Sequence, residues 1–97
     1  MNSPILRPEA AADVEEACRW YEARRQGLSD EFLDVVGEAL EFIGTHHESA
    51  PIVHRDIRRQ LLRRFPCGIL YRVIQARVVV LGCFHARRNP RAWRSRS

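Results

Sequence analysis

The side chains best suited to chemistry in this sequence are the arginines of its second half. Residues 51–97 hold twelve arginines and one acid, Asp56, which gives a formal charge of +11. Residues 1–50 hold four arginines and eleven acids, a formal charge of −7, and lysine is absent from the chain. Because a guanidinium group binds carboxylates and phosphates through a rigid fork of donors, the second half suits an acidic protein or a nucleic acid.

These arginines have two possible uses. Successive side chains of an extended strand point to opposite faces, so Arg58 and Arg59 need not belong to one basic surface. Arginines on strands can pair with the acids of the first half, or they can meet a partner. No acid lies near the Arg87–Arg96 run in the sequence, so this run favours partner binding.

His85, just before a pair of arginines, is the candidate acid or base. An unperturbed imidazole titrates near neutral pH, and neighbouring guanidinium groups can orient a phosphate for cleavage. A hydrogen-bonded structural histidine is the alternative. The remaining histidines, His46, His47 and His54, have no Cys or carboxylate at metal-ligand spacing, so no metal site and no cofactor is predicted. The sequence has no Ser/His/Asp order, phosphate loop or GxGxxG motif.

Hydrophobic periodicity predicts the elements that position these side chains. We expect a strand at residues 5–7, a helix over 9–25, and a second helix that Ser29 caps and that ends near Gly44. After Pro51 the period becomes that of strands, predicted at 57–65, 69–74 and 78–85. Asn89 and Pro90 then open a last helical turn that carries Trp93. The predicted fold is α+β in the order β-α-α-β-β-β, with a helical hairpin packed on a small, mostly antiparallel sheet.

Both faces of this sheet are predicted to be apolar. On the last strand, alternation places one set of side chains on one face: Val78, Val80 and Phe84. It places the other set on the opposite face: Val79, Leu81 and Cys83. A two-helix hairpin covers only one face, so the second face needs a lid. The tail around Trp93 supplies part of it, and a partner chain supplies the rest.

Composition predicts a single domain over 1–97, with 86–97 as a basic C-terminal tail. The longest apolar stretch, 78–84, is far shorter than the roughly 20 residues that span a bilayer, and the first residues lack the apolar segment of a signal peptide. Three cysteines without CxxC spacing indicate free thiols. We therefore expect a cytoplasmic protein that does not act at a membrane.

Four segments and one aromatic residue of this chain resemble the ParE/RelE superfamily of bacterial type II toxin–antitoxin toxins, most closely the ParE branch. They are ACRWY at 17–21, LSDEFL at 28–33, IRRQLLRRFPCGILYRV at 57–73, VVVLGCFHARRNP at 78–90, and Trp93. The resemblance spans nearly the whole chain in the right order, and its specificity lies in the series rather than in any one segment.

This resemblance implies a helical hairpin on a small antiparallel sheet and a cognate, ParD-like antitoxin with an acidic tail that folds over the toxin. Members of the ParE branch are understood to poison DNA gyrase, which arrests growth and underlies plasmid stabilisation. RelE-type members instead cut messenger RNA on the ribosome. The resemblance therefore implies DNA gyrase as the target here, with a ribosome-dependent mRNA endoribonuclease as the alternative.

Each function makes its own demand on the residues. For a gyrase inhibitor no catalytic residue is required, and the predicted target-binding residues are Arg87, Arg88, Arg91, Trp93 and Arg94. The predicted antitoxin-binding residues are Arg58, Arg59, Arg63, Arg64 and Arg72.

For a ribonuclease, His85 is the base, and Arg63, Arg72 or Arg87 lies at the phosphate. The chain has no lysine and no tyrosine after Tyr71, and a tryptophan such as Trp93 cannot exchange a proton. These departures favour the gyrase inhibitor over the enzyme. A protein of toxin fold that has lost toxicity is the third possibility.

Overall fold

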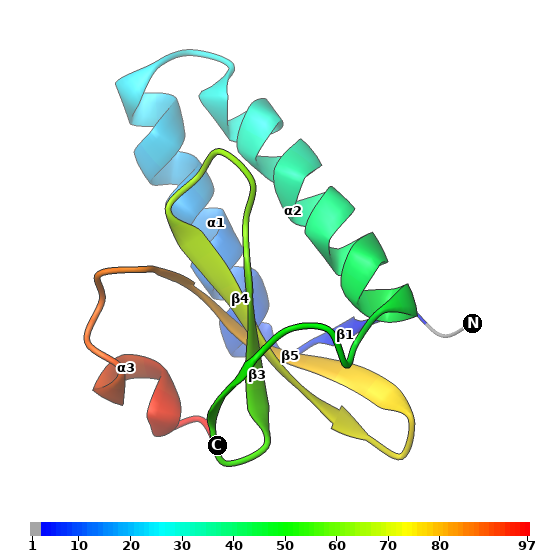
Figure 1. Cartoon of the computed structure of the whole chain (residues 1–97). Coiled ribbons are helices and arrows are strands. Elements are labelled where there is room, and N and C mark those ends of the chain that lie inside the picture. Colours follow the sequence, from blue (N-terminus) through cyan, green and yellow to red (C-terminus); the bar gives the residue numbers. More distant parts are fainter. Residues whose placement is uncertain (1–2) are drawn as a thin grey trace.

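A five-stranded sheet with helices on both faces organises the chain (Figure 1). The computed structural model describes residues 3–97. The elements are, in order, β1 (Ile5–Leu6), α1 (Pro8–Arg24), α2 (Leu28–Thr45), β2 (Ile52–His54), β3 (Ile57–Leu61), β4 (Cys67–Ile74), β5 (Arg77–His85) and α3 (Arg91–Arg94). The strand order is β1-β5-β4-β3-β2, with β1 parallel to β5 and the other pairs antiparallel. The predicted α+β fold is confirmed.

The two long helices form the expected hairpin, but the cap between them differs from the prediction. The second helix begins at Leu28 after Gly27, whose φ of 87° lies in the left-handed region that glycine adopts without strain. The expected cap, Ser29, lies inside the helix. The Glu22 carboxylate instead accepts the backbone N–H of Gly27 at 2.9 Å and of Ser29 at 3.1 Å. These hydrogen bonds, first that from Gly27, lower the pKa of Glu22.

The prediction of a three-stranded meander was incomplete because β2 adds an edge strand beside β3. Ile52 pairs with Arg58, and His54 pairs with Ile57. This strand has only three residues and is followed by Arg55 with a φ of 54°, rather than by the Asn-Gly or Asp-Gly typical of a tight hairpin. Neither its length nor its turn gives a clear sequence signal, so β2 forms mainly because β3 offers a free edge.

The prediction of which β5 residues share a face was correct up to Leu81 and wrong for Cys83 and Phe84. Tyr71 pairs with Val80, but the preceding residue, Leu70, pairs with Gly82, so Leu81 is an extra residue opposite β4. Such a β-bulge reverses the alternation beyond it. As a result, Val80 and Cys83 belong to the core under the helices, whereas Phe84 joins Leu81 on the other face.

The sheet separates two apolar cores. The larger lies between the sheet and the hairpin, where three rings meet with centroids 4.9–5.2 Å apart: Tyr21, Phe32 and Phe65. The smaller lies on the opposite face under α3, and its buried members are Ile57, Leu70, Leu81, Phe84 and Trp93. Trp93 is only 5% exposed. The predicted lid around Trp93 is therefore confirmed.

Candidate functional site

Four unpaired arginines form an exposed surface at the end of β5, and we call this set the C-terminal arginine surface: Arg87, Arg88, Arg91 and Arg94. Each residue is exposed. Within residues 3–97, none of the four forms an ion pair. Two of them rest on aromatic rings instead, Arg88 at 4.9 Å from the centroid of Phe84 and Arg94 at 5.7 Å from that of Trp93. The surface thus holds four cations without a carboxylate to neutralise them.

Trp93, the fifth residue predicted to bind the target, lies beneath this surface rather than on it. Its indole packs against Phe84 and Leu81 in the smaller core. Burial of so large a ring fixes α3 against the sheet. The structure therefore brings the four predicted arginines together on one segment and gives Trp93 the position that holds this segment in place.

The arginines predicted to bind an antitoxin lie on β3, on β4 and in the loop between them, because β3 ends at Leu61 rather than at the predicted residue 65. We call them the β3–β4 arginines, and they differ from the C-terminal arginine surface because most of them already have partners. Three form ion pairs with the chain's own carboxylates: Arg63 with Glu38 at 3.0 Å, Arg64 with Glu31 at 2.8 Å, and Arg72 with Asp56 at 2.9 Å. Arg58 donates instead to the backbone carbonyls of Glu48 and Ala50. Arg59 makes no hydrogen bond or ion pair from its side chain to another described residue.

Two of these ion pairs join the β3–β4 loop to the acidic side of α2. The Glu31 carboxylate accepts hydrogen bonds from Arg64 and from Arg25, each at 2.8 Å. These bonds, first that from Arg64, lower the pKa of Glu31. The side chains of these pairs are between 36% and 60% exposed, so water screens the attraction and the net stabilisation is small. Such pairs can open when a partner supplies other carboxylates.

A cavity of about 210 Å³ lies on the second face of the sheet, beside α3. Its cationic and titratable lining residues are Arg59, His85, Arg87 and Arg88. Gly68 makes room for one of them, because a Cβ at position 68 would lie 2.9 Å from the Cγ of Arg59. Among residues 3–97 no acid lines this cavity, so the charge of its lining favours a small anion.

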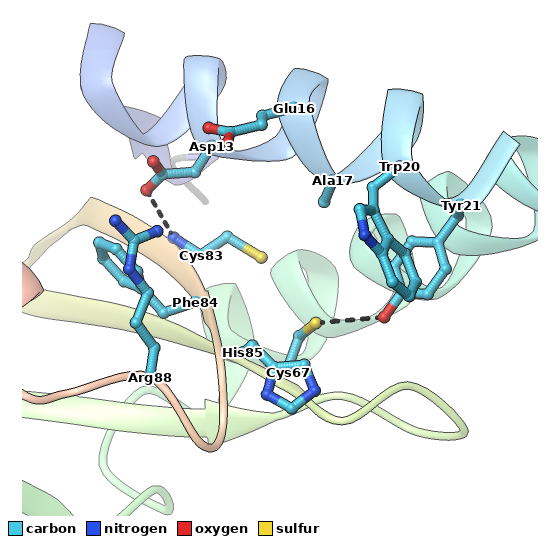
Figure 2. Close-up of a pocket in the computed structure, with 10 residues that line it drawn as sticks. All are labelled: Asp13, Glu16, Ala17, Trp20, Tyr21, Cys67, Cys83, Phe84, His85 and Arg88. Carbon is cyan, nitrogen blue, oxygen red and sulfur yellow. Dashed lines mark hydrogen bonds between the residues drawn. The ribbon is translucent and has the colours of Figure 1, made fainter. Parts of the chain in front are cut away.

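A second cavity, of about 340 Å³, lies between α1 and the ends of β4 and β5. Figure 2 shows Trp20 and Tyr21 of α1 on one side of it and Phe84 and Arg88 on the other. Its remaining lining residues are Asp13, Glu16, Ala17, Cys67, Cys83 and His85. The two thiols stay protonated at neutral pH, because burial raises the pKa of both and brings that of Cys83 to about 12.

One partly buried contact was not predicted from the sequence: the ion pair between Asp13 and Arg96. The two side chains are 10% and 22% exposed and meet at 2.6 Å. Asp13 also accepts the backbone N–H of Cys83, and Arg96 donates to the carbonyl of Leu81. Arg96 is therefore the exception in the Arg87–Arg96 run that was expected to have no acidic partner.

Gly82 is the sequence signal that could have pointed to this pair. A glycine within a strand often marks a close approach of other groups. Here a Cβ would lie 2.5 Å from a ring carbon of Phe84, 2.9 Å from the Arg96 guanidinium and 3.0 Å from an Asp13 oxygen. The absence of a side chain at Gly82 thus leaves room for the ion pair, and the ion pair connects the C-terminal segment to α1.

Comparison with known proteins supports the fold. No family model matches the sequence, and no curated protein is similar to it. Among solved structures, the chain is similar to one from the "Chromosomal ParDE TA system from P. aeruginosa", with a TM-score of 0.66 and 20% sequence identity. The match covers 88% of this chain and 96% of that chain. The chain therefore has the fold that the sequence resemblance implied. In the part of the chain that the structure describes, no helix is long and apolar enough to cross a membrane.

Proposed function

We propose that this chain is the cytoplasmic toxin of a type II toxin–antitoxin system, that it inhibits DNA gyrase, and that a ParD-like antitoxin neutralises it. The observation that carries this proposal is the C-terminal arginine surface, on a fold shared with a chain of a ParDE system. Unpaired guanidinium groups on an ordered segment gain most from a partner's carboxylates, because charge-assisted bidentate hydrogen bonds are the strongest available to side chains.

The antitoxin contact is supported by a groove between α2 and β3. This groove, of about 260 Å³, is lined by exposed apolar side chains, Phe42 and Leu61, beside the ion pair of Arg63 and Glu38. An acidic tail that folds on binding can cover the apolar side chains and take over the guanidinium of Arg63. Arg63 would then exchange the internal carboxylate of Glu38 for one of the antitoxin.

The alternative, a ribosome-dependent endoribonuclease, has one observation in its favour: the cavity lined by Arg59, Arg87, Arg88 and His85 could hold a phosphate. The hydrogen bonding of His85, however, does not suit a general base. Its Nδ1 accepts the backbone N–H of Arg87 at 3.1 Å, so in the neutral imidazole the proton resides on Nε2. That nitrogen can donate a hydrogen bond but has no free lone pair to take a proton from a ribose hydroxyl. Inhibition by binding, which needs no proton transfer, remains the better proposal.

Inducible expression in bacteria, with and without the neighbouring small open reading frame, tests the proposal. We expect growth arrest with a DNA-damage response when the chain is expressed alone, and rescue by the antitoxin. With purified protein, gyrase supercoiling should fall and gyrase-linked DNA cleavage should rise. Replacement of Arg88 by Glu should weaken both effects. Arg77→Glu, at an exposed arginine at the opposite end of β5, is the matched control.

Three outcomes would count against gyrase inhibition. Unchanged supercoiling and cleavage would refute it directly. Translation arrest with cuts in messenger RNA that disappear in His85→Ala would establish the ribonuclease. Normal growth without any antitoxin would show a toxin fold that has lost toxicity.

A further inference from the structure

We infer that the cavity beside Trp20 and the adjoining arginines form one two-part binding site for an acidic protein segment that carries a bulky apolar side chain. The apolar side chain would enter the 340 Å³ cavity, and the acids that flank it would meet Arg88 and the rest of the C-terminal arginine surface. This inference rests on the proposed function, because it specifies the chemistry of the partner that the arginine surface takes.

The aromatic side of the cavity is available to a ligand. Trp20 is 53% exposed, yet its position is fixed by an edge-to-face contact with Tyr21, at 5.1 Å between ring centroids, and by the guanidinium of Arg24 at 4.0 Å. An exposed aromatic ring that is already held in place loses little conformational entropy when a ligand covers it. Trp, Tyr and Arg are also the residue types that dominate the energy of protein interfaces.

The volume fits a side chain of a partner as well as it fits a small molecule. Ligand pockets start at roughly 300 Å³, and here the cavity has about 340 Å³. Its walls are mostly apolar: Ala17, Trp20, Tyr21, Phe84 and the two protonated thiols. An apolar group that leaves water for this cavity gains the usual hydrophobic free energy. A charged group would lose hydration, and the partly buried Asp13 carboxylate in the wall is already paired with Arg96.

Charge decides which kind of apolar segment fits. Arg88 lines the cavity and also belongs to the C-terminal arginine surface, with its guanidinium over the Phe84 ring at 4.9 Å. The cavity and the surface are therefore continuous through one side chain. Glu16 lies on the α1 side of the cavity (Figure 2), so the acids of the partner segment are confined to the Arg88 side. An acidic segment with an apolar anchor satisfies both parts, whereas a basic segment would be repelled by the C-terminal arginine surface.

Two synthetic acidic peptides test the inference on the purified full chain. They are identical except for one central residue, leucine in one and alanine in the other, with glutamates on one side of it. Isothermal titration calorimetry should show about tenfold tighter binding of the leucine peptide, because burial of the larger side chain adds apolar area. The NMR signal of the Trp20 indole N–H should shift with the leucine peptide and shift little with the alanine peptide.

A cavity-filling variant and a matched control locate the effect. Ala17→Leu fills the cavity from α1 and should abolish the preference for leucine, whereas Ala12→Leu, at an exposed position of the same helix, should keep it. If Ala17→Leu lowers the thermal midpoint too far for use, Trp20→Ala removes one exposed wall and should reduce the preference in the same way. Arg88→Ala should weaken both peptides equally and reduce the salt dependence of their binding.

Equal affinities for the two peptides, or a leucine preference that persists in Ala17→Leu, would overturn the inference. Concentration-dependent self-association that Ala17→Leu prevents would also overturn it, by showing that a second copy fills the cavity. These results are separate from those for gyrase. A clear leucine preference in a protein without effect on gyrase would contradict the proposed target alone, and inhibition of gyrase without a leucine preference would contradict this inference alone.

Discussion

The β3–β4 arginines and the C-terminal arginine surface show how one residue type serves two purposes in one small fold. Arg63 and Arg64 of the β3–β4 loop pair with carboxylates of α2, and Arg72 of β4 pairs with Asp56 in a neighbouring turn. On the C-terminal segment, Arg87, Arg88, Arg91 and Arg94 hold none within residues 3–97. The difference is not in sequence chemistry but in what the fold places opposite each guanidinium. Unpaired charge is therefore a better guide to a partner surface here than charge density.

The largest effect is expected from Trp93→Ala, which removes the buried support of the C-terminal arginine surface. Truncation of a buried tryptophan costs about 3–5 kcal/mol of unfolding free energy, a large share of the total for a domain of this size. Urea denaturation monitored by circular dichroism measures it. Trp20→Ala, a truncation of the exposed tryptophan, is the control and should cost much less. Equal costs would show that α3 does not depend on Trp93.

The next effect concerns Arg96, the one arginine of the C-terminal segment that has an internal partner. Asp13→Ala leaves its guanidinium partly buried without a counter-ion and frees the backbone N–H of Cys83. We expect a loss of about 2–3 kcal/mol, below the range for a fully buried pair because Arg96 keeps some contact with water. The double variant Asp13→Ala/Arg96→Ala should lose less than the sum of the single variants. Strict additivity would contradict a coupled pair.

One substitution in each group of arginines tests whether the two groups have different functions. Arg88→Glu should raise the concentration for half-maximal gyrase inhibition by roughly tenfold or more with little change in unfolding, because it reverses a charge in the proposed target site. Arg63→Ala should leave inhibition nearly unchanged and weaken antitoxin binding. Both are measured by supercoiling assays and by calorimetry with the antitoxin. The reverse pattern would exchange the assignments of the two groups.

The smallest effect is a pH dependence carried by Glu31. Its carboxylate has a pKa below the ordinary 4.5 because Arg64 and Arg25 donate hydrogen bonds to it. The folded state therefore binds this proton less readily than the unfolded state does. The contribution to stability is present above 4.5 and is lost as the pH falls through the lower, folded-state pKa. In the wild type, the urea midpoint should be slightly lower below the folded-state pKa of Glu31 than above pH 4.5. This difference between the two pH values should shrink in Glu31→Gln and should keep its wild-type size in Glu41→Gln, on the same helix.

The local order of elements followed from the sequence because periodicity and turn residues act over short distances. The hairpin of α1 and α2, the strands β3, β4 and β5, and the Trp93 lid were predictable in this way. Strand β2 was not, because three residues carry too little periodicity. The faces of β5 beyond Leu81 were not predictable either, since the bulge at Leu81 is fixed by pairing with β4 rather than by the residues of β5 alone.

The sequence alone determined which charged residues are present: an acidic first half and an arginine-rich second half without lysine. It also determined that the second face of the sheet is apolar. What only the tertiary structure decided is which charges neutralise one another. Arg63 and Glu38 are 25 residues apart, and Asp13 and Arg96 are 83 apart, so each pair depends on strand order and register that no local pattern encodes. The physical reason is that charge pairing in a protein is set by distance and burial, and both arise only when the chain has folded.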